Sequence, residues 1–257
     1  MRNYRVFLQK EWMEFFRNKR FLGLAAVFLM FAFSSPILAR FMLEFLAMLL
    51  PGEELFQMLL PTPAWTDSYA QFYSNIEQIG SITMILLFMG VISSEKQRGT
   101  ADLMFTKGLC RMSFVLSKFT VLAVSVFVTT MVSVLTVFGY TLLLFDTAGD
   151  FGNVLFGGFV FFLFFLFLLS LIVLCSTVAK SSVSAALFGF LAFLGIIFIS
   201  SIPWIGTYLP GRLLSHSRMI TFGQTPDGLL ICILVTLLLT AATLYLAIRL
   251  LRRQEGQ

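Results

Sequence analysis

Residues 154–178 read VLFGGFVFFLFFLFLLSLIVLCSTV, and none of these side chains is charged. A helix needs roughly 20 apolar residues to cross the hydrocarbon core of a bilayer. The buried core of a large soluble enzyme would be interrupted by turns every dozen residues or so, and this stretch contains no such interruption. It is therefore predicted to be a transmembrane helix.

Five further stretches of the chain have the same character. None of the six contains Asp, Glu, Lys, Arg or His. The one near 78–94 is the shortest and has polar flanks. The spans are predicted near residues 21–39, 78–94, 119–145, 154–178, 183–202 and 229–248. The predicted fold is all-α: a polytopic membrane protein with six transmembrane helices in one domain, 1–257.

Composition supports this class of protein. Of the 257 residues, 58% are hydrophobic, 12% are charged and 31 are phenylalanine, whereas about 25% of residues are charged in a typical soluble domain. The cysteines are Cys110, Cys175 and Cys232, which are too few for a disulfide-stabilised secreted scaffold. So much apolar surface requires lipid as its solvent.

The distribution of cations predicts the topology. Fifteen of the 18 lysines and arginines lie in residues 1–20, in the loop 95–118, at Lys180 or after the last span. Cytoplasmic segments of membrane proteins are enriched in these residues. Both termini and the loop 95–118 are therefore predicted to face the cytoplasm of a cell whose plasma membrane holds the chain. The net charge of +5 is explained without a nucleic-acid partner.

Residues 3–20 are predicted to form an amphipathic helix. Apolar side chains, Tyr4, Phe7 and Phe15 among them, recur at helical spacing, and cations such as Lys10 and Arg17 lie between them. Such a helix lies in the plane of the lipid headgroups.

Two segments on the opposite side are longer than simple connections. Residues 40–77 contain apolar runs, Phe41 to Leu50 and Leu55 to Leu60, that are predicted to be interfacial helices broken by Pro and Gly. Residues 203–228 are compatible with a re-entrant hairpin or with a surface loop carrying an aromatic anchor, and the sequence leaves both open.

No catalytic, cofactor-binding or metal-binding residue is predicted. The only histidine, His216, has no second ligand nearby in the sequence, and Glu53–Glu54 lie beside a Pro-Gly turn. A phosphate-binding glycine-rich loop is absent from the sequence, so the chain is not expected to hydrolyse a nucleotide by itself.

A row of hydroxyl side chains runs along one face of the third predicted span. Ser125, Thr129, Ser133 and Thr136 recur at spacings of four, four and three residues. They either line a translocation path or donate hydrogen bonds to carbonyls of their own helix. The first alternative makes them candidate path residues.

The loop 95–118 is predicted to contain a short helix. Gly99 ends the preceding helix, Thr100 is expected to be the N-cap, and Asp102 lies in the first turn. Lys107 and Gly108 supply signals for its C-terminus. The middle of this helix, Leu103-Met104-Phe105, is apolar and is predicted to be exposed, as a groove on a partner protein would require.

The sequence here resembles the permease subunits of bacterial ABC-2 type exporters. The resemblance is carried by Glu95-x-x-x-Gly99-Thr100, then Leu103, Arg111 and Lys118-Phe119, and is supported by Lys10-Glu11 and by Arg17 to Arg20. It implies that 3–20 is an elbow helix and that the loop helix is a coupling helix, which docks on a separate ATPase. The coupling residues that it implies are Glu95, Arg98, Gly99, Thr100, Asp102, Leu103, Met104, Phe105 and Arg111.

The resemblance implies a transport subunit without its own enzyme activity. ATP and Mg would be bound by the ATPase partner, and the permease would work as a homodimer or as a heterodimer with a similar permease. Truncation of Leu103 or Phe105 is expected to uncouple ATP hydrolysis from transport.

Two other functions are the alternatives: an ion-coupled transporter or channel, and a membrane-bound enzyme. The lack of titratable residues in the predicted spans disfavours the ion-coupled transporter. The sequence does not identify the substrate.

Overall fold

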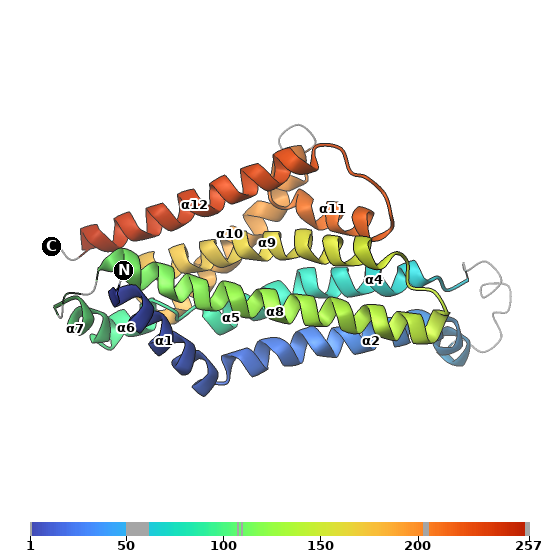
Figure 1. Cartoon of the computed structure of the whole chain (residues 1–257), viewed down its shortest axis with the longest axis horizontal. Coiled ribbons are helices and arrows are strands. Elements are labelled where there is room, and N and C mark those ends of the chain that lie inside the picture. Colours follow the sequence, from blue (N-terminus) through green and yellow to red (C-terminus); the bar gives the residue numbers. More distant parts are fainter. Residues whose placement is uncertain (1, 50–61, 107, 109, 203–205, 255–257) are drawn as a thin grey trace.

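The computed structural model describes residues 2–49, 62–106, 108, 110–202 and 206–254, and it contains helices and no strand within these residues (Figure 1). Its elements, in chain order, are α1 (Arg2–Arg17), α2 (Arg20–Leu49), α4 (Trp65–Asn75), the π-helix η1 (Ile76–Gly80), α5 (Ser81–Phe88), α6 (Ser93–Gln97), α7 (Thr100–Thr106), α8 (Arg111–Phe145), α9 (Phe151–Val178), α10 (Ser182–Ser200), the 3₁₀-helix η2 (Gly206–Tyr208), α11 (Arg212–Thr221) and α12 (Leu229–Gln254).

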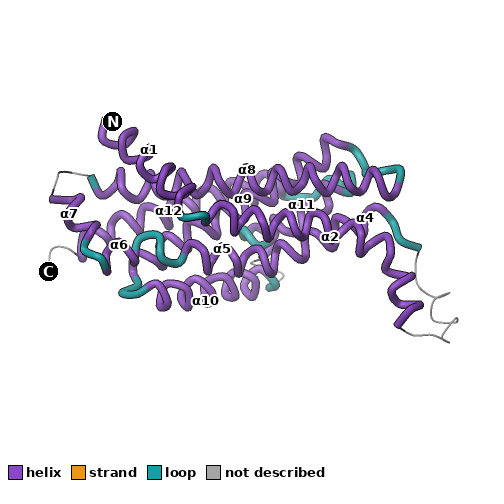
Figure 2. The backbone as a smooth tube through the Cα atoms, turned by 90° about the horizontal axis from the view of Figure 1, so that it is seen from below, coloured by secondary structure: helices purple, strands orange, loops and turns teal. Residues whose placement is uncertain are grey.

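Six helical segments are long and apolar enough to cross a membrane. They are Arg20–Met42, Trp65–Gln97, Arg111–Phe145, Phe151–Val178, Ser182–Ser200 and Leu229–Arg253. The all-α polytopic fold is thus confirmed. The beginning of α1 and the end of α12 lie at the same end of the bundle as α6 and α7 (Figure 1). Helix α10 runs alongside α5 (Figure 2).

Helix α9 is the central element of the bundle. It packs against α8, α10, α11 and α12, so it is covered on most sides by protein. Phe161, Phe164 and Phe165 are fully buried on it and stack edge to face at 4.9 Å and 5.6 Å between ring centroids. Much of the unusual phenylalanine content therefore fills the protein core, where aromatic edge-to-face pairs are favourable.

The second span begins well before residue 78, where it was predicted to begin. Its helix begins at Trp65, and Asp67 in the first turn accepts a hydrogen bond from the amide of Ala64 at 2.9 Å. The prediction that residues 65–77 belong to an outer segment was wrong, because their polar side chains form hydrogen bonds inside the bundle. Tyr69 donates to the carbonyl of Ala148, and the hydroxyls of Tyr73 and Thr221 are 2.9 Å apart.

This extension brings a carboxylate into a membrane span. Glu77 lies in the π-helix η1 and forms an ion pair with Arg218 of α11. The prediction that the spans lack titratable groups was therefore wrong for the second span. It was also wrong at the start of the third, because α8 begins at Arg111 and includes Lys118. π-turns within helices frequently mark functional positions.

The first helix after the elbow also exceeds its predicted span. Helix α2 continues through Pro36 to Leu49, so the run from Phe41 is helical and continuous with the first span, whose membrane-crossing part ends at Met42. The predicted helix at Leu55 to Leu60 and the residues Glu53–Glu54 lie outside the described residues. The fourth, fifth and sixth spans differ from their predicted limits by a few residues.

Between α10 and α12 the chain forms a short helix packed into the bundle. Leu213, His216, Ser217 and Ile220 of α11 are buried, and α11 packs against the N-terminal half of α9. This placement agrees with the re-entrant alternative; Pro203, Trp204 and Ile205 lie outside the described residues.

The contact between α9 and α11 depends on a glycine. A Cβ atom at Gly157 would overlap Oγ1 of Thr221 and the carbonyl oxygen of Ser217. Gly157→Ala is therefore expected to destabilise the protein by about 1–3 kcal/mol, the usual cost of overpacking. The thermal unfolding midpoint of the purified protein in detergent measures this change. Gly195→Ala is the control, because nothing lies within 4 Å of its Cβ position; equal midpoints for the two variants would contradict the packing argument.

Candidate functional site: an ion cluster beneath a short loop helix

Two glycines in the left-handed conformation frame α7. Gly99 has φ +67° and Gly108 has φ +83°, values that other residues adopt only at a cost. Helix α7 ends at Thr106, just before Gly108, as predicted. Thr100, however, does not have the predicted role of N-cap. Its hydroxyl does not cap α7 but donates to the carbonyl of Glu95 at 3.1 Å. This bond ties the start of α7 back onto α6. Lys107 and the side chain of Asp102 lie outside what is described.

The apolar middle of α7 divides into one exposed and two packed side chains. Leu103 is 63% exposed. Met104 and Phe105 are partly buried against the core; the Phe105 ring lies 5.2 Å from that of Phe114, and the Arg111 guanidinium lies over it at 5.5 Å. The prediction of three exposed residues was wrong, because α8 begins early enough to offer Phe105 an aromatic partner.

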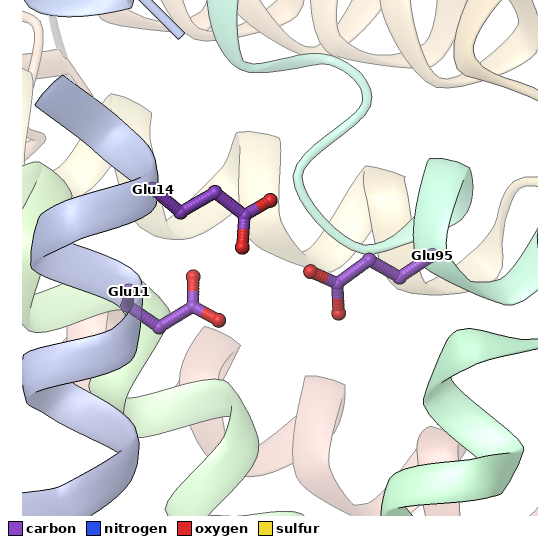
Figure 3. A group of neighbouring side chains, drawn as sticks. All are labelled: Glu11, Glu14 and Glu95. Atoms are coloured by element: carbon purple, nitrogen blue, oxygen red, sulfur yellow. The ribbon is translucent and has the colours of Figure 1, made fainter. Parts of the chain in front are cut away.

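Glu95 turns inward to a cluster of charges. Lys118 of α8, only 3% exposed, donates to Glu95 at 2.7 Å and to Glu11 of α1 at 2.9 Å. Lys10 lies 3.6 Å from the same Glu95 oxygen and 2.7 Å from Glu14. The three carboxylates converge from two elements, Glu11 and Glu14 from α1 and Glu95 from α6 (Figure 3). We refer to these five residues as the ion cluster. It joins α1, α6 and α8.

The cluster holds its half-exposed members in their charged forms. Burial alone would lower the pKa of Lys10, but the hydrogen bond to Glu14 and the charges of Glu11 and Glu95 raise it. Burial likewise opposes ionisation of Glu14, yet the hydrogen bond from Lys10 lowers its carboxyl pKa. Both groups therefore remain charged through the neutral range.

The carboxylates of the cluster also have the composition of a metal site. Ligand atoms of Glu11, Glu14 and Glu95 lie within 4.8 Å of one another. However, the ammonium groups of Lys118 and Lys10 already lie between these oxygens and neutralise part of their charge. The arrangement is therefore that of an ion-pair network.

Helix α6 is also attached to the end of α9. Lys96 donates to the carbonyl of Thr177 at 2.7 Å, a favourable position for a cation at a helix C-terminus. The hydroxyl of Ser176 accepts from the amides of Ile92 and Ser93 at 3.0 Å and 3.1 Å. The loop between spans two and three thus contacts α1, α8 and α9 through polar bonds.

A groove lies beside the ion cluster. It has a volume of about 660 Å³ and is lined by both charged and apolar residues of α1, α5, α6, α7 and the starts of α2 and α10. Lys10, Glu14, Arg98 and Met104 are among them. Arg98 is exposed, so of the predicted coupling residues Arg98 and Leu103 face outward, whereas Glu95 and Phe105 contact the bundle.

Lys10, Glu11, Glu14, Lys96 and Lys118 all lie in segments described from the sequence, but none of them was predicted to be a site residue. The sequence contained one signal for the ion cluster. Lys118 directly precedes the apolar run that begins at Phe119, and a charge in such a place needs a partner. Its partners are 107 and 23 residues away in sequence.

The hydroxyl row lies inside the subunit. Ser125, Thr129 and Ser133 are buried and Thr136 is partly buried. Ser125 and Thr136 donate to carbonyls four residues back at 2.7 Å and 2.8 Å. The hydroxyls of Thr129 and Ser133 have no partner among the described residues.

The fold and these contacts define a multi-pass membrane protein with a structured loop at the end that carries both termini. Residues 6–222 match the model of the ABC-2 family transporter proteins, and the chain belongs to this family. It is thus the permease component of an ABC transporter, a transport subunit that is not itself catalytic. No curated protein sequence matches the chain.

Proposed function

We propose that the chain is the membrane subunit of an ATP-driven exporter and receives force from a separate ATPase subunit through α7. The observation that carries this proposal is the combination of one exposed leucine, Leu103, with a loop that is bonded to three helices. A partner that moves α7 would move α1, α8 and α9 with it. Both termini and this loop would then face the cytoplasm, as the cation distribution predicts.

The groove beside α7 is the docking position in this proposal. Its lining combines cations and carboxylates with apolar surface, which suits a polar, partly apolar surface segment of an ATPase. ATP binding by two ATPase subunits would draw two permease subunits together and open the path outward, and hydrolysis, with Mg at the ATPase, would reset them. Thr129 and Ser133 remain candidates for that path because their hydroxyls have no partner within the described residues.

Co-purification tests the proposal. The tagged permease is expected to retain the ATPase encoded beside it through detergent extraction and gel filtration. In proteoliposomes containing both, export should stop on ATP depletion and continue in the presence of an uncoupler. Transport that the uncoupler abolishes and ATP depletion leaves unchanged would instead identify an ion-coupled carrier.

A further inference from the structure

A second cavity is lined in part by α11, a helix that lies in the half of the molecule opposite to the termini (Figure 1). Its volume is about 240 Å³. It forms where the end of α10 and the re-entrant helix α11 meet the π-helix of the second span. The lining residues are Glu77, Ile197, Ser200, Ser201, Gly211, Arg212, Leu214, Ser215 and Arg218.

The charges around this cavity do not balance. Arg218 is paired with Glu77. Arg212 has no carboxylate within 4 Å among the described residues. Arg212 is exposed and Arg218 is partly buried, so two cations against one anion leave an excess of one positive charge around this cavity.

The lining also contains donors without acceptors. Oγ of Ser200 and Nε of Arg218 have no hydrogen-bond partner among the described residues. Buried donors normally have a partner, since leaving one unpaired costs free energy. Ile197 and Leu214 form an apolar wall beside these donors, and Phe198 and Ile199 continue the exposed apolar surface of α10.

We propose that this cavity binds the anionic headgroup of an amphiphile. A carboxylate or phosphate group would be bound by Arg212 and Arg218, since guanidinium groups bind both oxyanions in bidentate geometry. An acyl chain would follow α10. Glu77 competes with the ligand for Arg218 and keeps the affinity moderate. The inference does not depend on how α7 acts, because α7 and α11 lie towards opposite ends of the bundle (Figure 1).

The test measures lipid retention by the purified full-length protein. Native mass spectrometry in mild detergent counts bound phosphatidylglycerol as the lipid is titrated, with phosphatidylcholine as the zwitterionic comparison. Arg212→Gln is expected to weaken phosphatidylglycerol binding about tenfold, and Arg212→Lys should retain most of it. Glu77→Gln is expected to strengthen binding, since it removes the competing carboxylate.

Arg40→Gln is the matched control. Arg40 is an exposed arginine on α2 towards the same end of the bundle, so the variant changes net charge equally without touching the cavity. Competition by inorganic phosphate at the same concentration would assign the site to a free anion; its failure to compete would assign it to the lipid headgroup. Equal loss in Arg212→Gln and Arg40→Gln, or equal retention of both lipids, would overturn the proposal.

Discussion

Replacing Lys118 with methionine is expected to cause the largest loss of stability of any single substitution at the ion cluster. Lys118 is the buried shared donor to Glu11 and Glu95, so its removal leaves these two buried carboxylates to the half-exposed Lys10, which lies 3.1 Å and 3.6 Å from them. Breaking a buried ion pair by removing one partner costs about 3–5 kcal/mol. Methionine is chosen because it fits the aromatic surroundings of Phe114 and Phe7, which lie 5.1 Å and 6.0 Å from the ammonium group.

Thermal unfolding in detergent is the measurement, and a fall of roughly 10 °C is expected for a chain of this size. Lys180→Met is the control, because Lys180 is exposed and carries the same charge. Adding Glu11→Gln and Glu95→Gln to Lys118→Met should restore most of the stability, since neutral groups tolerate burial without the lysine. A midpoint for Lys118→Met equal to that of the Lys180 control would show that the cluster does not join the three helices energetically.

Replacing Leu103 with alanine is expected to produce the opposite pattern, intact folding with lost coupling. The side chain is largely exposed, so its truncation removes little from the core. If it inserts into the ATPase, a central apolar contact of this kind contributes about 2 kcal/mol, or roughly a thirtyfold loss in association. ATP-driven export by proteoliposomes should fall accordingly, while the unfolding midpoint stays unchanged.

Two comparisons make this test specific. Leu187→Ala removes a leucine of similar exposure, 60%, from α10 and should leave export intact. Phe105→Ala should lower the unfolding midpoint as well as export, because Phe105 packs on Phe114. The assignment of α7 as the docking element would be wrong if Leu103→Ala exported as well as the Leu187 variant.

The sequence predicted the parts of the fold that depend on local hydropathy. All six spans were found because lipid-facing and core-facing residues are both apolar, so no long-range information was needed. The limits of α7 were also predictable, since Gly99 and Gly108 act through their own backbone conformations. Of the three apolar residues predicted to be exposed on α7, only Leu103 is largely exposed.

The errors arose where a polar group is satisfied by a distant part of the chain. Residues 65–77 were assigned outside the membrane because Asp67, Tyr73 and Glu77 lower their hydropathy. The partners of Tyr73 and Glu77, Thr221 and Arg218, are more than 140 residues away. Lys118 was likewise placed in a loop because Glu11 was not recognised as its counter-ion. Exposure of Phe105 was overestimated because Phe114 could not be located from the sequence.

Helix α9 has a consequence for the relation between the two membrane surfaces. With 28 residues it is about 42 Å long. Its C-terminal end is bonded to α6 through Ser176 and Thr177, and its first turns hold α11 through the close contact at Gly157. A closely packed helix behaves as a stiff rod. Any tilt imposed on it near the loop is therefore expected to displace the re-entrant helix at the far surface.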